Sequence, residues 1–200
     1  MQEIISKEEF NKLMSFKGEA KGTGLKSYAE FILKEEGERG LKRFEEALAK
    51  AGYLMKYQDI KPTYLYPVGE WILFLLVAKR LFNYDDKKFQ EMGIFQVKVS
   101  TLIRFFMKYF VSIERASGAL PKIWRQHFTI GDFSTVELNK EKKYIILKLE
   151  NFVDYDPVEC QLIIGVLIGS VQMILNSKVI CEETKCSLRG DQHHEFILKW

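Results

Sequence analysis

The hydrophobic residues in the first two thirds of the chain recur mostly every three or four positions, which is the spacing of helices that bury one face. Residues 68–82 are apolar nearly all round, a pattern typical of a helix buried on every side. Gly37 and Gly40 interrupt the second helical stretch, and Gly52 has the place of its C-cap. The predicted helices lie within residues 1–20, a charged lead-in, and over residues 28–51, 68–82, 89–110 and 113–126, the last broken near Gly118 and Pro121.

Two segments between these helices have the composition of turns. KGTGLKS (residues 21–27) contains two glycines, and KPTYLYP (residues 61–67) combines two prolines with aromatic residues. The first is not a phosphate-binding loop, because Leu25 separates Gly24 from Lys26 and no apolar strand precedes it. We therefore predict a plain turn there, and we expect no nucleotide.

The period changes after residue 126. Residues 133–138 and 144–149 alternate in the manner of strands around the polar turn NKEKK, which predicts a β-hairpin. A buried helix over residues 157–175 follows, and then two strands, 178–183 and 194–200, around a Gly190-Asp191 turn. The order β-β-α-β-β predicts an α+β domain in which helices pack on an antiparallel sheet. Residues 1–200 are expected to form one domain.

Composition narrows the class of protein. The 200 residues are 47% hydrophobic and 28% charged, which excludes a disordered chain. A net charge of +3 is too small for a dedicated nucleic-acid binder. Neither of the two most apolar stretches predicts a membrane span, and with no leader sequence and three clustered cysteines we expect a reducing cytoplasm.

The sequence offers no catalytic constellation. It lacks a Gly-x-Ser-x-Gly elbow. His127 is the one histidine outside the tail, and a histidine at the end of a helix more often has a surface or capping role. Nothing in the chain supplies a redox cofactor site. We therefore expect a non-catalytic domain.

The tail contains a set of metal-binding residue types. Two thiolates, a carboxylate and an imidazole suit tetrahedral zinc. The predicted elements place these residues at the start of the last helix, the exit of one strand and the entry of its partner, so they converge at one end of the sheet. The candidate ligands of a closed, structural zinc site are Cys160, Glu183, Cys186 and His194.

Three alternatives remain open for this tail. Cys160 begins a strongly apolar helix and has the setting of an ordinary core cysteine. His193 competes with His194, and Cys181 shares a strand face with Glu183 and is able to substitute as a ligand.

The stretch Glu183-x-x-Cys186-x-x-x-Gly190-Asp191-x-x-His194-x-Phe196 resembles the terminal signature of the 4-vinyl reductase domain. In members that sense aromatics in bacterial regulators, zinc is held by Cys, Glu, Cys and Cys, which implies the same site here with His194 at the last position. The resemblance covers about residues 157–200. KGTGLKSYAEFI, YPVGEWILFL and LPKIWRQHFTIGDF are similar to a family of uncharacterised bacterial domains first noted in myxobacteria.

Both families resemble the ligand-binding fold of the TRAPP vesicle-tethering subunits, which implies an apolar cavity and a homodimer. The haem-based nitric-oxide sensors have a similar length, but they need a proximal histidine on a mid-chain helix and a Tyr-x-Ser-x-Arg clamp. YFVSIER (residues 109–115) does not fit that clamp, and no histidine precedes His127. The sequence therefore predicts no haem.

The predicted function is a sensory or regulatory domain that binds a small apolar, aromatic or lipid-like ligand. Pockets of this kind are mostly apolar with a few polar anchors. The alternative is a dimeric protein–protein interaction module without a ligand, in which the aromatic residues simply fill the core. The residues expected to line the pocket, beside the helices over 68–82 and 89–110, are Trp71, Phe74, Phe105, Phe106, Tyr109 and Trp124.

Overall fold

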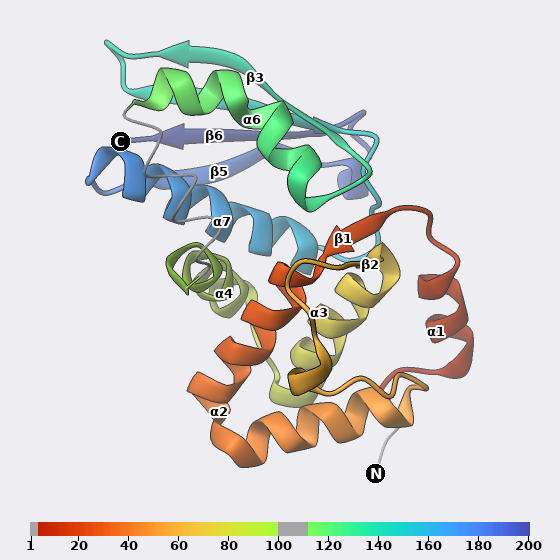
Figure 1. Ribbon diagram of the computed structural model, residues 1–200. Coiled ribbons are helices and arrows are strands. Elements are labelled where there is room, and N and C mark those ends of the chain that lie inside the picture. The colour runs from red at the N-terminus through yellow and green to blue at the C-terminus, as the bar shows by residue number, and fades with distance from the viewer. Residues whose placement is uncertain (1–3, 100–111) are drawn as a thin grey trace.

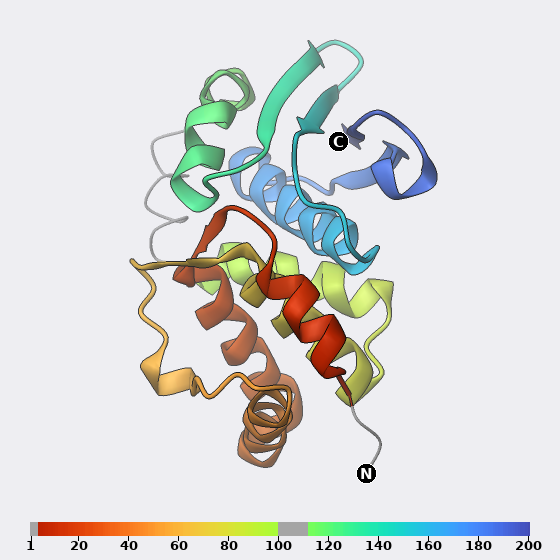
Figure 2. The same cartoon turned by 90° about the vertical axis from the view of Figure 1, so that its right-hand side faces the viewer.

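The structure, a computed structural model, describes residues 4–99 and 112–200, which form two lobes (Figures 1 and 2). The N-terminal lobe is helical, and the C-terminal lobe is an antiparallel sheet with two helices on its inner face. This mixed architecture confirms the predicted α+β class.

The N-terminal lobe is built around the buried helix α3, Val68–Phe82. Ten of its residues are buried, because α1, α2 and α7 pack against it. A two-stranded antiparallel ribbon closes one end, with Ala20 opposite Tyr66. The other elements of this lobe are α1 (Lys7–Met14), β1 (Glu19–Lys21), α2 (Gly22–Lys50), the 3-10 turn η1 (Tyr57–Asp59), β2 (Leu65–Pro67) and α4 (Asp86–Val99).

The C-terminal lobe holds a four-stranded antiparallel sheet in the order β3-β4-β6-β5. Alternating residues of its strands face the inner side, where Phe133, Leu147 and Phe196 meet apolar side chains of two helices. The elements are α6 (Ile113–His127), β3 (Asp132–Asn139), β4 (Tyr144–Glu150), α7 (Val158–Leu175), β5 (Ile180–Lys185), the 3-10 turn η2 (Ser187–Arg189) and β6 (His194–Lys199).

The predicted turn over residues 21–27 is wrong, because Lys21 ends β1 and residues 22–27 form the first turns of α2. Glycine is needed there for space: a Cβ at Gly22 would lie 2.4 Å from the Lys61 carbonyl oxygen. The predicted interruption at Gly37 is confirmed by a φ of 68°. The break predicted near Pro121 is absent, since α6 runs through that residue to His127.

Helix α7 joins the two lobes (Figure 2). Its first turns, with Val158 and Leu162, belong to the N-terminal core, whereas Ile164 and Leu167 belong to the core under the sheet. By length and composition α7 is apolar enough to cross a membrane, with a mean hydropathy of 1.9, but this apolar surface is the packing surface of both lobes. The helix is therefore accounted for as a core element.

Candidate functional site

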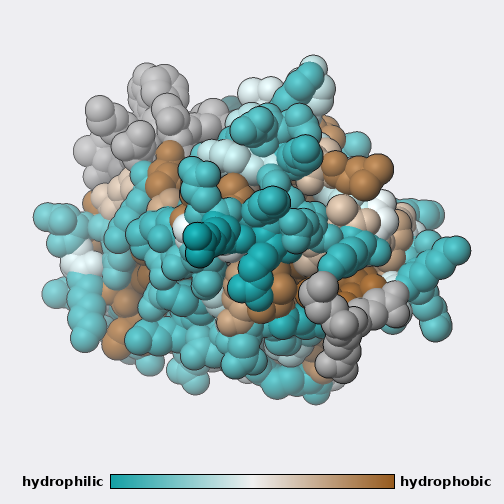
Figure 3. All heavy atoms as spheres, turned by 90° about the horizontal axis from the view of Figure 1, so that it is seen from below, coloured by the Kyte–Doolittle hydropathy of each residue, from teal (hydrophilic) through white to brown (hydrophobic). Residues whose placement is uncertain are grey.

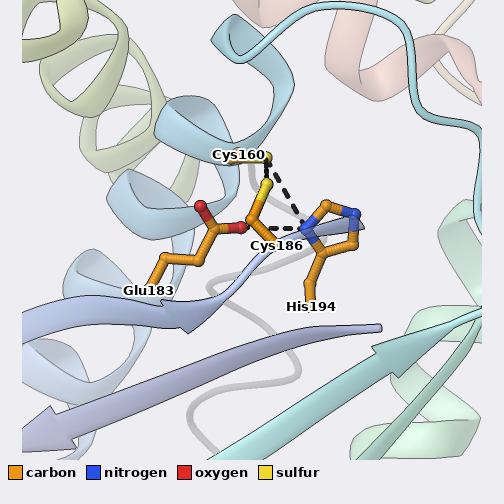
Figure 4. A group of neighbouring side chains, drawn as sticks. All are labelled: Cys160, Glu183, Cys186 and His194. Atoms are coloured by element: carbon orange, nitrogen blue, oxygen red, sulfur yellow. Dashed lines mark hydrogen bonds and ion pairs between the residues drawn. The ribbon is translucent and has the colours of Figure 1, made fainter. Parts of the chain in front are cut away.

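The four predicted metal ligands meet at one end of the sheet (Figure 4). Cys160 lies in the first turn of α7, and His194 is the first residue of β6. Glu183 lies near the end of β5, and Cys186 follows that strand directly. Residues far apart in the sequence are thus brought together by the packing of α7 against the β5–β6 hairpin.

The geometry of this cluster suits a single ion. The Sγ atoms of Cys160 and Cys186 are 3.9 Å apart, and Cys160 Sγ lies 3.7 Å from His194 Nδ1. One donor atom from each of the four residues lies within 4.8 Å of all the others. Tetrahedral bonds of the usual length place neighbouring donors about 3.3–3.8 Å apart. Small side-chain adjustments therefore suffice to close the shell.

Asp154 fixes the orientation of His194. Its Oδ1 atom accepts a hydrogen bond from His194 Nε2 at 2.6 Å, so Nδ1 faces Cys160 and Glu183 in the cluster. Carboxylate partners of this kind commonly orient histidines that bind metals. Asp191 holds the backbone of Cys186 in place, because its Oδ2 accepts a hydrogen bond from the Cys186 backbone N–H at 2.8 Å. Sequence analysis missed Asp154, which stands outside the tail motif.

The carboxylates around His194 favour a positive charge within the cluster. Burial, above all, raises the pKa of the Cys160 thiol to about 12. Burial lowers the pKa of His194, but hydrogen bonds with Asp154, Cys160 and Glu183 outweigh it and raise that pKa to about 12. Glu183 Oε1 lies 2.8 Å from His194 Nδ1. A proton on His194 balances these carboxylates, and a bound cation would take over the same role.

The structure discriminates between the alternatives in the tail. Cys160 is buried, as the core reading expects, but its thiol faces Cys186 and His194. Cys181 and His193 do not join the group of donors that the described residues form. His193 lies instead 4.0 Å from Glu195.

A cavity of about 160 Å³ lies between the two lobes. Three helices of the N-terminal lobe and the inner face of the C-terminal lobe enclose it. Its described walls are almost wholly apolar and include no Lys, Arg, Asp or Glu. They consist of Tyr28, Trp71, Gln96, Ile113, Ala116, Ser117, Leu120, Ile123, Trp124, His127, Phe128, Phe133, Ile145, Leu147, Leu162, Ile163, Val166, Leu167, Ser170, Val171 and Ile174.

Two of the predicted pocket residues, Trp71 and Trp124, line this cavity. Phe74 does not: its ring packs edge-on against Phe44 and Tyr53 in the N-terminal core. That prediction is wrong because α3 is buried on all sides, so only one of its faces reaches the cavity. Phe105, Phe106 and Tyr109 lie outside the described residues.

The polar wall residues gather on the N-terminal side. The Trp71 indole N–H donates to the Tyr28 hydroxyl oxygen at 2.6 Å. Gln96 is 8% exposed, and among the described residues its Oε1 atom has no hydrogen-bond partner. Sequence analysis missed Tyr28 and Gln96. The sequence signal that could have identified Gln96 is its position as a polar residue on an apolar face of α4.

His127 contributes a neutral imidazole to the wall. Burial, together with the charge of Lys21, lowers its pKa to about 4. The expectation of a surface or capping histidine is thus replaced by a position at the end of α6 that borders the cavity.

A two-lobe α+β domain with an apolar cavity between its lobes is the class that fold and site define. No protein-family model matches the chain, and no curated protein matches it. Solved structures do. An H-NOX protein from S. oneidensis in the Fe(II)NO ligation state aligns with a TM-score of 0.68 and 13% identity, over 90% of this chain and 98% of that one. The unliganded Fe(II) H-NOX protein from K. algicida aligns at 0.62 with 12% identity, over 90% and 95%.

These comparisons correct two predictions. The structures matched are H-NOX domains, so the predicted resemblance to the 4-vinyl reductase domain and the TRAPP fold is wrong. Short tail motifs carried that resemblance, whereas the fold is set by the whole chain. The expectation of a fold without haem is wrong as well, since the matched proteins are described by the ligation states of their iron or by their haem. Zinc receives no support from them.

The volume and the wall residues of the described cavity can be compared with what a haem group requires. The cavity volume of about 160 Å³ is close to the roughly 150 Å³ that holds one benzene molecule, and below the roughly 300–1,000 Å³ of larger ligand sites. A haem group needs an axial ligand to its iron, and His127 is the histidine of the described walls. It also needs cationic side chains beside its two carboxylates. The described walls contain no Lys or Arg. These residues do not fit a haem group.

Proposed function

We propose that this protein is a non-catalytic sensory domain that binds a small, uncharged, apolar molecule between its two lobes. The observation that carries the proposal is the cavity of about 160 Å³ with apolar, charge-free described walls. An apolar cavity of about 150 Å³ stays dry and accepts a ligand such as benzene. The two H-NOX structures reported above are not described as enzymes, which supports a non-catalytic domain.

The position of the cavity supports a sensory role. Its walls come from both lobes, and α7 supplies wall residues while it also contributes to both cores. A ligand in this place contacts the two lobes at once. Its binding therefore favours the arrangement in which the lobes are closed on it, which is the differential contact that a conformational signal needs.

The test uses benzene as the probe and two alanines of α6 as a matched pair. Ala116 lines the cavity and Ala119 does not. We expect benzene to raise the melting temperature of the wild-type protein and of Ala119→Phe. Benzene should leave the melting temperature of Ala116→Phe unchanged, because the new ring fills the cavity. Benzene titrated by calorimetry should give the same ranking. The proposal fails if benzene and a panel of small neutral aromatics leave the wild-type melting temperature unmoved, or if the purified protein shows a Soret band.

We further propose that Cys160, Glu183, Cys186 and His194 bind one divalent transition-metal ion. The support is the convergence of two thiols, an imidazole and a carboxylate within 4.8 Å, backed by Asp154 on the far side of the imidazole. Thiolate and imidazole donors select ions of this class over Mg²⁺ or Ca²⁺. Four protein donors leave no open position, so the ion would hold the start of α7 against the β5–β6 hairpin rather than activate water.

Cobalt(II) is a suitable probe because thiolate ligation gives it a visible spectrum. We expect one equivalent of Co²⁺ to produce intense tetrahedral and thiolate charge-transfer bands. Cys160→Ser should weaken these bands, and Cys181→Ser, the matched control in the same lobe, should leave them intact. An octahedral Co²⁺ spectrum, or equal loss in both variants, would rule the site out.

A further inference from the structure

We propose that the cavity selects a ligand with one hydroxyl group, which accepts a hydrogen bond from Tyr28 and donates one to Gln96. The inference rests on the function proposed above and names the chemical class of its ligand: a neutral, single-ring alcohol of about the size of benzene. The observations, made on the described residues, are a buried oxygen without a partner and a buried hydroxyl hydrogen without an acceptor, both in cavity walls that are otherwise almost wholly apolar.

Gln96 supplies the acceptor. The residue is 8% exposed and lines the cavity, and its Oε1 atom has no partner in the part of the chain that the structure describes. Buried polar atoms of native proteins are nearly always hydrogen-bonded, so an orphaned one needs an explanation. Leucine or methionine would fill the same space in α4 without this cost. A ligand donor that reaches Oε1 explains why glutamine stands there.

Tyr28 supplies the donor. Its oxygen already accepts the Trp71 indole N–H at 2.6 Å, and it donates no hydrogen bond to any described residue. Trp71 thereby leaves the hydroxyl hydrogen as the remaining polar function of this side chain. Burial raises the pKa of Tyr28, so the hydroxyl keeps its proton over the whole physiological range.

Gly24 brings the two groups to the same place. A Cβ built on Gly24 would lie 3.2 Å from the Tyr28 hydroxyl oxygen and 3.7 Å from Gln96 Nε2. The Tyr28 hydroxyl and the Gln96 amide therefore lie beside the same part of α2. A hydroxyl group both donates and accepts, so it is the simplest group that satisfies both.

The remaining walls define what the rest of the ligand is. The described lining has no charged side chain that would balance a carboxylate or an amine, and a buried unpaired charge is strongly disfavoured. The volume of about 160 Å³ matches one six-membered ring. The described walls therefore disfavour acids and long-chain lipids, and a bare hydrocarbon leaves Gln96 Oε1 without a partner among the described residues.

The experiment compares three ligands that differ only in the polar group: cyclohexanol, methylcyclohexane and cyclohexanecarboxylate, titrated by calorimetry and by thermal shift. We expect cyclohexanol to bind about tenfold or more tightly than methylcyclohexane, the effect of one or two buried hydrogen bonds, and the carboxylate to show no binding. Gln96→Met should remove the preference for the alcohol, keep the affinity for methylcyclohexane, and raise the melting temperature of the ligand-free protein. Tyr28→Phe should also remove the preference.

Ser117→Ala is the control. Ser117 lines the same cavity, but its hydroxyl donates to the Glu114 carbonyl oxygen inside α6, so the selectivity should stay unchanged. Equal affinities for cyclohexanol and methylcyclohexane in the wild type would overturn the inference and leave the cavity as a ligand site. If neither compound binds to the wild type and benzene also fails, the proposed function itself falls.

Discussion

Two histidines of this chain show how buried neighbours set the charge of the same side chain in opposite directions. His194 lies between the carboxylates of Asp154 and Glu183, and its pKa is raised. His127 borders an apolar cavity, with Lys21 as its main charged neighbour, and its pKa is lowered to about 4. The first is suited to exchange a proton for a cation, and the second stays neutral.

Replacement of Asp154 by alanine should weaken metal binding without removing a ligand. The carboxylate fixes the ring of His194 through Nε2, and loss of such a partner typically costs about 10–100-fold in metal affinity. We expect the Co²⁺ charge-transfer bands of Asp154→Ala to keep their position while the dissociation constant rises by that factor. Asp132→Ala, on exposed Asp132 of β3, is the control. An unchanged affinity in Asp154→Ala would show that the packing of β6 alone orients His194.

His127 should make the protein less stable in mild acid. Its folded-state pKa of about 4 lies below the unfolded value of about 6.5. The unfolded chain therefore binds the proton first, and stability is lost as the pH falls through this window. The loss relative to pH 7 is about 2 kcal/mol at pH 5.

His127→Gln removes this titration and keeps a neutral polar side chain. Urea midpoints measured at pH 7 and pH 5 should fall less for His127→Gln than for the wild type, and the difference between the two falls isolates this residue from the carboxylates. Equal falls for both proteins would mean that His127 is protonated in the folded state as easily as in the unfolded one.

Helices α4 and α7 pack with their backbones in close contact, and glycine makes this contact possible. A Cβ on Gly93 would lie 2.4 Å from the Leu162 carbonyl oxygen, and one on Gly165 would lie 2.1 Å from that of Gln90. The sequence shows these glycines inside helical patterns, where glycine is unfavourable. Only the neighbouring helix explains their presence.

Gly93→Ala should destabilise the protein by about 1–3 kcal/mol, because the added methyl group forces the two backbones apart. Gly118→Ala in α6 is the matched control: no atom of the described residues lies within 4 Å of a Cβ at this position, so the better helix former should stabilise by up to about 1 kcal/mol. Urea denaturation measures both. Opposite signs are expected, and a neutral Gly93→Ala would show that α4 is free to shift.

The two lobes should unfold together. α7 contributes Val158 and Leu162 to one core and Leu167 to the other, so neither core is complete without it. We expect a single transition with the same urea midpoint in Trp71→Phe and Trp124→Phe proteins that both also carry Trp200→Phe, once each variant's own stability change is measured by circular dichroism. The one tryptophan left in each protein then reports on a different lobe. A fluorescence midpoint that departs from the dichroism midpoint in either variant would show that the lobes unfold separately.

The predicted homodimer and the alternative of an interaction module without a ligand stay predictions. The resemblance that implied a dimer no longer supports it. Figure 3 shows one end of the molecule, where hydrophilic residues separate small hydrophobic groups. Exposed apolar side chains on other parts, such as Ile180 on the edge strand β5, remain the physical reason to expect self-association. Light scattering at tens of micromolar should give twice the chain mass of 23.5 kDa, and a monomer mass would end this prediction.

The sequence by itself determined most elements of this protein. Periodicity placed the helices over 68–82 and 157–175 and the hairpin of β3 and β4 at almost their observed bounds, because burial on one face or on all faces leaves a direct trace in residue order. The spacing of the tail also predicted that four residues converge, because the ends of adjacent elements in a hairpin-helix unit lie close together. These residues are Cys160, Glu183, Cys186 and His194.

Tertiary structure alone decided the rest. The start of α2 at Gly22, the course of α6 through Pro121 and the ribbon of β1 and β2 depend on neighbours distant in the chain. The same holds for the cavity. Its volume is what remains after two lobes pack around α7. The roles proposed for Gln96 and Tyr28 arise because the fold leaves one atom of each without a partner among the described residues. Residue order fixes which side chains seek burial, but the voids and unpaired groups are set by how whole elements pack.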